Sequence, residues 1–182
     1  MTTTNTPLPA AGQKLPTNQV VPLMTALLVA VFAFQLNASM LAPALHTMEM
    51  DLNATTAQIG MTQTAFFTAA AVFALFMPRW GDLIGRRKVL VWMMIVTVIG
   101  SVVAALATNV TMLFIGRVIQ GVSGPTVALT SVMLRQAVRE EKQFAFLVGI
   151  LTSVNGGIAG IDAILGGWLT DAFGFRSLFW VI

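Results

Sequence analysis

The sequence predicts an all-α integral membrane protein, a bundle of helices that each cross a bilayer. Of its 182 residues, 57% are hydrophobic and only 9% are charged, whereas about 25% of a soluble domain is charged. The charged residues are also clustered, because none lies between Lys14 and Glu49, Asp51 and Arg79, or Lys88 and Arg117. Each gap can hold a membrane helix of about 20 apolar residues, and runs of this length are helices because lipid leaves backbone groups no other partner.

Five complete spans and the start of a sixth are expected. Residues 1–19 are expected to form a disordered cytoplasmic tail without a removable signal peptide, and residues 20–182 a transmembrane half-domain. The predicted spans are 20–45, 59–78, 89–107, 111–134, 145–169 and a sixth, 177–182, that we expect to be truncated.

Basic residues predict how the spans are oriented. Eight fall on one side of the predicted membrane, and Arg176 alone falls on the other. The eight are Lys14, Arg79, Arg86, Arg87, Lys88, Arg135, Arg139 and Lys142. Because Lys and Arg collect on the cytoplasmic side, we expect a multi-pass protein of the inner (plasma) membrane with its amino terminus in the cytoplasm. The basic residues punctuate apolar runs and line no single face, so no nucleic-acid partner is expected.

The short connection after the second span contains Asp82, Gly85, Arg86 and Arg87. Gly85 permits a tight turn, and Asp82 can pair with Arg86 across it. The alternative interpretation is a simple basic anchor.

The fourth span carries an arginine, which is costly in a membrane and indicates function. Arg117, Gln120, Gly121 and Gly124 follow a helical spacing and share one face. The two glycines are expected to let another helix approach closely.

At these residues the sequence resembles the major facilitator superfamily, most closely its drug–proton antiporters. Asp82, Gly85, Arg86 and Arg87 match the superfamily's Gly-x-Leu-Ala-Asp-Arg-x-Gly-Arg-Arg loop, with Pro78 for the leading Gly and Leu83 for the first Arg. In the fourth span, Arg117, Gln120 and Gly121 match the antiporters' Arg-x-x-Gln-Gly signature. The resemblance covers roughly residues 20–182 and implies a major facilitator-type helical bundle, of which this chain is the N-terminal half.

Two further signatures are present in altered form. Asn37 stands where the antiporters' first span has an acid, and Ser39 replaces a Thr. In the fifth span Asp162-Ala163 replaces Gly-Pro. These changes favour a substrate other than a drug.

Depth estimates bring three polar residues to one level. Asn37, Arg117 and Asp162 all fall in the outer half of the bilayer, within about one helical turn of each other. We therefore predict a charge pair between Arg117 and Asp162 that couples to protons, with Asn37, Ser39 and Gln120 lining a cavity. The alternative is a permanently ionised pair that holds the two spans together. Gln35 and Asn37 point to nearly opposite sides, so at most one faces a central cavity.

Small residues in the fifth span predict a close-packing face that includes Gly156 and Gly160. The same face is also compatible with a sliding surface during transport.

The resemblance implies a secondary active transporter, not an enzyme, that works by alternating access between two six-helix halves. The leading hypothesis is proton-coupled export of drugs or amphipathic small molecules. One alternative is a proton-coupled importer of a small polar metabolite; another is a truncated, non-transporting fragment or a half-transporter partner. No cofactor or metal site is predicted, and the expected partners are the lipid bilayer, a small-molecule substrate, protons and the missing C-terminal six-helix half.

Overall fold

The computed structural model describes residues 17–138 and 140–182, which form helices and turns with no strand among them. The helices are α1 (Thr17–Ser39), η1 (Ala42–Ala44), α2 (Leu45–Asp51), α3 (Thr56–Ile84), α4 (Arg86–Ala105), α5 (Val110–Gln120), η2 (Gly121–Ser123), α6 (Thr126–Ala137), α7 (Glu141–Gly157), α8 (Ala159–Phe173) and α9 (Arg176–Val181). Two sequence expectations, the state of the first sixteen residues and the position of Arg139, lie outside the described residues.

Five stretches of the described chain are long and apolar enough to cross a membrane. They are Val20–Asp51, Thr56–Ile84, Arg86–Ala105, Val110–Ala137 and Glu141–Phe173. These stretches agree with the five complete spans expected from the sequence, and α9 begins where the sixth was expected. The second is longer than predicted, because α3 continues through Pro78 to Ile84. The fifth is interrupted at Ile158, between α7 and α8.

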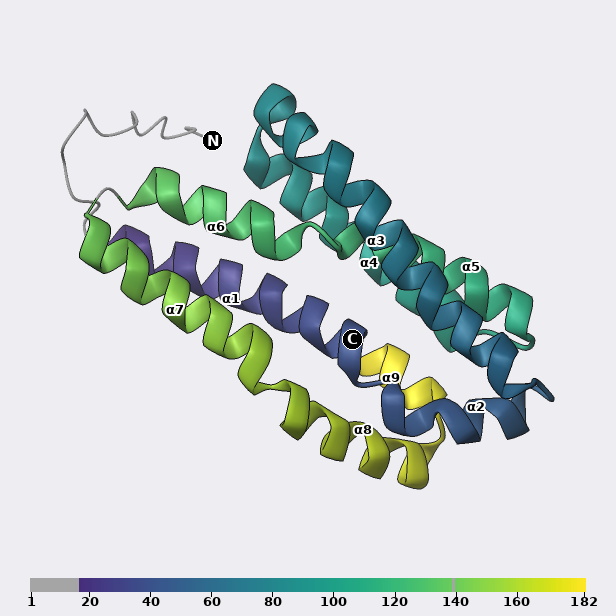
Figure 1. Ribbon diagram of the computed structural model, residues 1–182. Coiled ribbons are helices and arrows are strands. Elements are labelled where there is room, and N and C mark those ends of the chain that lie inside the picture. Colours follow the sequence, from purple (N-terminus) through teal and green to yellow (C-terminus); the bar gives the residue numbers. More distant parts are fainter. Residues whose placement is uncertain (1–16, 139) are drawn as a thin grey trace, which may run out of the picture.

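Two groups of helices make up the bundle (Figure 1). In one group α4 packs against both α5 and α3, and α9 packs on α4. In the other, α1 lies alongside α6, α7 and α8. This arrangement places α1 next to the interrupted fifth span over most of its length.

Buried apolar side chains form two clusters along the bundle. One surrounds Met40, Met48, Leu113 and Phe175 at the end near α2 and α9. The other includes the following buried residues: Leu27, Val31, Met77, Met93 and Leu129. Along α1, α4 and α5 the buried polar residues fall where one cluster gives way to the other.

Large apolar side chains cover much of the outer surface. Leu75 is 76% exposed and Ile164 is 74% exposed. A soluble protein rarely shows so many apolar side chains to water, whereas lipid would surround them favourably.

The turn between α3 and α4 is built on Gly85. Its φ of +102° is a conformation that glycine adopts without strain. Arg86 donates from Nη2 to Asp82 Oδ1 at 2.6 Å and from Nε to the same oxygen at 3.1 Å. The loop expected between the second and third spans is therefore mostly helical, closed by one glycine and an ion pair between exposed Asp82 and partly buried Arg86.

Candidate functional site

Arg117 is completely buried in the middle of the bundle, on α5. Its Nη1 donates to the side-chain oxygen and, at 3.3 Å, to the backbone carbonyl of Asn37 on α1. The same nitrogen donates to Gln120 Oε1 at 2.9 Å, and Nη2 donates to Gln63 Oε1 on α3 at 2.7 Å. Four neutral oxygens from three helices thus solvate the guanidinium.

Two more residues complete this surround, which we call the amide cage (Asn37, Gln63, Gln120, with Phe66 and Ser101). The Phe66 ring lies under the guanidinium, with 4.1 Å between Cζ and the ring centroid, and such a cation–π contact is strongest when water is excluded. Gln120 Nε2 donates to Ser101 Oγ on α4 at 2.8 Å. Gln63 Nε2 donates to the Ala38 carbonyl at 3.0 Å, so one amide holds both Arg117 and α1.

Local sequence signals set the register of the two helices that carry most of the cage. Thr55 begins α3 with a capping box, in which Gln58 Oε1 accepts from Thr55 N at 2.9 Å. Asn109 begins α5 by accepting from Met112 N at 2.9 Å. With both starts fixed, Gln63 and Arg117 come to face each other.

Two glycines allow the segment that follows α5 to lie very close to α3. A methyl group at Gly121 would lie 2.4 Å from the Cβ of Ala69, and one at Gly124 would lie 2.5 Å from the Cβ of Ala70. No side chain fits in such spaces, so the cage is enclosed by closely packed backbone. At Gly156 and Gly160, by contrast, an added methyl group would meet nothing within 4 Å. The structure therefore differs from the expectation of close packing at these two glycines, since the described chain places no helix against them.

Asp162 is also completely buried, but on the other side of α1. Its Oδ2 accepts a hydrogen bond from Ser39 Oγ, and its Oδ1 has no partner within the described part of the chain. Ser39 Oγ also lies 2.8 Å from the Gln35 carbonyl, and Gln35 Nε2 donates to Ser39 Oγ at 3.0 Å. We call Asp162, Ser39 and Gln35 the carboxylate cluster.

No ion pair joins Arg117 to Asp162 among the ion pairs of the described residues. Asn37 binds the arginine and Ser39 binds the carboxylate, and two residues apart on a helix point to nearly opposite sides. The structure brings all the predicted polar residues to one level, yet α1 stands between the two charges. A direct pair in another conformation and a role in proton coupling both stay predictions.

Two residues of this site, Gln63 and Ser101, had no assigned role in the sequence interpretation. Both are uncharged, and nothing in their spacing distinguishes them from polar residues that bond to their own helix. Gln35 was expected to point away from Asn37, and it bonds Ser39 on the opposite side of α1 from Arg117. One usable signal was the pair Gln63 and Phe66, which lie one turn apart on α3 and so face the same direction. Phe66 is fully buried whereas Phe67 beside it is 48% exposed.

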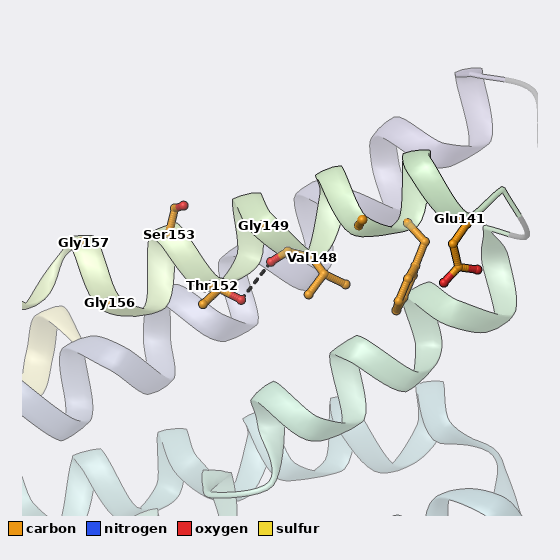
Figure 2. A pocket seen from close by; sticks show the side chains of 9 residues that line it. Glu141, Val148, Gly149, Thr152, Ser153, Gly156 and Gly157 are labelled. Carbon is orange, nitrogen blue, oxygen red and sulfur yellow. Dashed lines mark hydrogen bonds between the residues drawn. The ribbon is translucent and has the colours of Figure 1, made fainter.

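An open groove of about 890 Å³ runs along α7, away from both charges. It is lined by Glu141, Phe144, Ala145, Val148, Gly149, Thr152, Ser153, Gly156 and Gly157. Figure 2 shows Ser153 projecting away from the helix and the Thr152 hydroxyl turned back, where it bonds the Val148 carbonyl at 2.9 Å. Glu141 accepts from Arg135 of α6 at 3.0 Å. The groove therefore offers a mainly apolar surface of small side chains.

A metal centre would need several closely placed ligands. Within the described ranges, no three His, Asp or Glu side chains gather in this way. The polar groups of the site are one cation, one carboxylate, neutral amides and two serine hydroxyls.

Known proteins resemble this chain over most of its length. It is 59% identical, over 163 residues, to the uridine/deoxyuridine transporter of Lactococcus lactis subsp. cremoris, covering 90% of this chain and 34% of the relative. It is 32% identical over 160 residues to the multidrug efflux pump SdrM of Staphylococcus aureus, covering 86% of this chain and 35% of the pump. It is 32% identical over 180 residues to an uncharacterized MFS-type transporter of Mycobacterium tuberculosis, covering 99% of this chain and 26% of that protein.

The chain thus spans about a quarter to a third of the length of these curated relatives. Residues 27–182 match the family model of the Major Facilitator Superfamily. Together with the helical bundle and the five candidate spans, this match shows that the chain belongs to the Major Facilitator Superfamily.

Proposed function

We propose that this chain forms the N-terminal helices of a secondary transporter that takes up pyrimidine nucleosides such as uridine and deoxyuridine. The observation that carries this proposal is the 59% identity with the lactococcal uridine/deoxyuridine transporter across nine-tenths of the chain. Identity with the multidrug efflux pump is much lower, at 32%. The comparison favours the importer of a small polar metabolite over the drug exporter that headed the sequence hypotheses.

The polar centre is compatible with a small, uncharged and hydrogen-bonding substrate. Asn37 stands where the antiporters that this chain resembles carry an acid, and it leaves Arg117 surrounded by neutral oxygens. Drug export is the second candidate function, supported by the similarity to the efflux pump.

Proton coupling would fall to Asp162. It is the one carboxylate buried among the described spans. Its Oδ1 has no hydrogen-bond partner there, so a proton could be gained or lost at this oxygen without breaking an existing bond. Transport itself would need helices beyond this chain, since the matched region is only about a third of the length of those relatives. In such a complete protein the two halves would alternate access to a site near the middle of the membrane.

Uptake of radiolabelled uridine tests the proposed function. Expressed from its complete coding sequence in a host without uridine uptake, the wild type should accumulate uridine, and a protonophore should abolish accumulation. Asp162→Asn should lose accumulation against a gradient while still exchanging uridine with internal uridine. Ser153→Ala, which changes an exposed hydroxyl elsewhere in the fifth span, is the matched control and should accumulate normally. Energy-dependent extrusion of a cationic dye without uridine uptake would favour drug export.

The membrane orientation is part of this proposal. We propose that the amino terminus and the turn between α3 and α4 face the cytoplasm, on the strength of the basic residues there. A single cysteine at Ala54 should react with an impermeant thiol reagent outside intact cells, and one at Arg86 should not. Labelling at position 86 but not at position 54 would show that the orientation is the reverse of the one proposed.

A further inference from the structure

Ser39 has more hydrogen-bonding neighbours than its one hydroxyl proton can serve. Its Oγ contacts the Gln35 carbonyl, Gln35 Nε2 and Asp162 Oδ2. A serine hydroxyl donates once and accepts twice. Gln35 Nε2 can only donate, so it occupies one of the two lone pairs of the Ser39 oxygen. The Gln35 carbonyl and the Asp162 carboxyl group then compete for the hydroxyl proton and the second lone pair of Ser39.

The two protonation states of Asp162 resolve this competition in different ways. When Asp162 is protonated, its carboxyl group donates to Ser39, and Ser39 donates to the Gln35 carbonyl. When Asp162 is ionised, it only accepts, so Ser39 has to turn its proton towards the carboxylate and away from the Gln35 carbonyl. The proton that Asp162 gains or loses is exchanged with water, and Ser39 keeps its own proton throughout.

We propose that Ser39 is the positioning residue through which the protonation state of Asp162 acts on α1. Ser39 is the last residue of α1, and its bond to the Gln35 carbonyl is the kind of i−4 contact that bends helices. Losing that bond changes the end of α1 about half a turn from Asn37. Asn37 in turn contacts Arg117 with both its side-chain and backbone oxygens, so a change at Ser39 is passed to the amide cage.

The groups around Asp162 leave Ser39 as its nearest polar contact. The helices that pack on α8 are α1, η1, α7 and α9, and residues 20–45 contain no charged side chain. On α7 the charged residues, Glu141 and Lys142, lie in the first turn, far from Asp162 along the chain. Arg176 of α9 donates to the Ala107 carbonyl at 3.0 Å, and Asp171 lies more than two turns further along α8. Arg117 lies beyond α1, in the amide cage.

This inference rests on the proposed role of Asp162 as the proton site, and infrared spectroscopy can separate the two. In the purified protein, a pH-difference spectrum should contain the carbonyl band of a protonated carboxyl group that Asp162→Asn removes. Ser39→Ala should move that band to higher frequency, because the protonated carboxyl group loses its hydrogen-bond partner. Ser39→Thr retains the hydroxyl and should keep the band close to its wild-type frequency, as should the control Ser153→Ala.

Each outcome bears on a different claim. A band lost in Asp162→Asn but unchanged by Ser39→Ala would overturn the Ser39 link and leave Asp162 as the proton site. A band that persists in Asp162→Asn would overturn the proton site as well. If Ser39→Ala cannot be purified folded, Gln35→Met, which removes the amide donor but keeps the backbone carbonyl, should still shift the band by a smaller amount, and no shift would refute the cluster. The uridine-uptake assay reports separately on the substrate.

Discussion

Arg117 and Asp162 are both fully buried, yet their surroundings are built in opposite ways. The arginine contacts three amide side chains and an aromatic ring, behind helices that touch through Gly121 and Gly124. The aspartate has one bonded oxygen and one free oxygen, on a span interrupted at Ile158. The closely packed glycines beside Arg117 differ from Gly156 and Gly160 of the fifth span, which face open space. Closer to η1 the fifth span is closely packed too, because a methyl group added at Gly166 would lie 2.5 Å from the Met40 carbonyl oxygen.

The interruption of the fifth span supports this contrast. Neither α7 nor α8 contains a proline that could break the span. Two glycines, Gly156 and Gly157, end α7 just before Ile158. Glycine weakens a helix interior by roughly 1 kcal/mol relative to alanine. The Ile158 carbonyl accepts from both Ile161 N and Asp162 N at 2.9 Å, so the new helix begins one turn before the carboxylate. We infer that bending at this point would move Asp162 relative to α1.

Glycine substitutions should show this difference most strongly. Gly121→Ala places a methyl group into the backbone of α3 and should destabilise the protein by about 1–3 kcal/mol, the usual cost of overpacking. Gly156→Ala enters open space and should leave stability unchanged or raise it by up to about 1 kcal/mol. Thermal unfolding in detergent measures both. Equal losses at the two positions would mean that the fifth span is as tightly enclosed as α5.

The Asp82–Arg86 pair should matter less for stability than for turnover. It lies at the surface, with the Asp82 side chain 60% and the Arg86 side chain 21% exposed, and surface pairs contribute about 0–1 kcal/mol. Asp82→Asn should therefore unfold close to the wild-type temperature. If the turn latches α3 and α4 during cycling, the same variant should reduce the uridine uptake rate at unchanged membrane yield. Uptake at the wild-type rate would reduce the turn to a basic anchor.

Much of this organisation could be predicted from the sequence, because charge-free runs specify spans and residue counts specify depth. Depth estimates correctly placed Asn37, Arg117 and Asp162 at one level. They could not say which side of α1 each charge faces, because position around a helix depends on how the helices pack. The continuation of α3 through Pro78 was missed for a related reason. Proline weakens a helix, but neighbouring residues in a membrane bundle can compensate.

Gln63 shows what a single sequence does not reveal. An uncharged amide in an apolar span can bond to many different groups. The packing of α3 against α5 is what brings the Gln63 amide within hydrogen-bond distance of Arg117. The open faces of Gly156 and Gly160 are a further case, since glycine spacing indicates where a helix can approach but not whether one does.

Two double-mutant cycles on unfolding free energy test most directly whether the charges are held separately. Arg117→Ala and Asn37→Ala remove two partners in one contact, so their combined effect should differ from the sum by about 1–3 kcal/mol. Arg117→Ala and Asp162→Ala should deviate from additivity by much less, under about 1 kcal/mol, because the two groups have no direct contact and are linked only through the end of α1. If Arg117 and Asp162 formed a direct ion pair, the second cycle would instead show the large departure from additivity. The double variant Arg117→Ala/Asp162→Ala would then recover most of the loss caused by either single change, since breaking one side of a buried pair typically costs about 3–5 kcal/mol. Such recovery would contradict the separation of the two charges by α1.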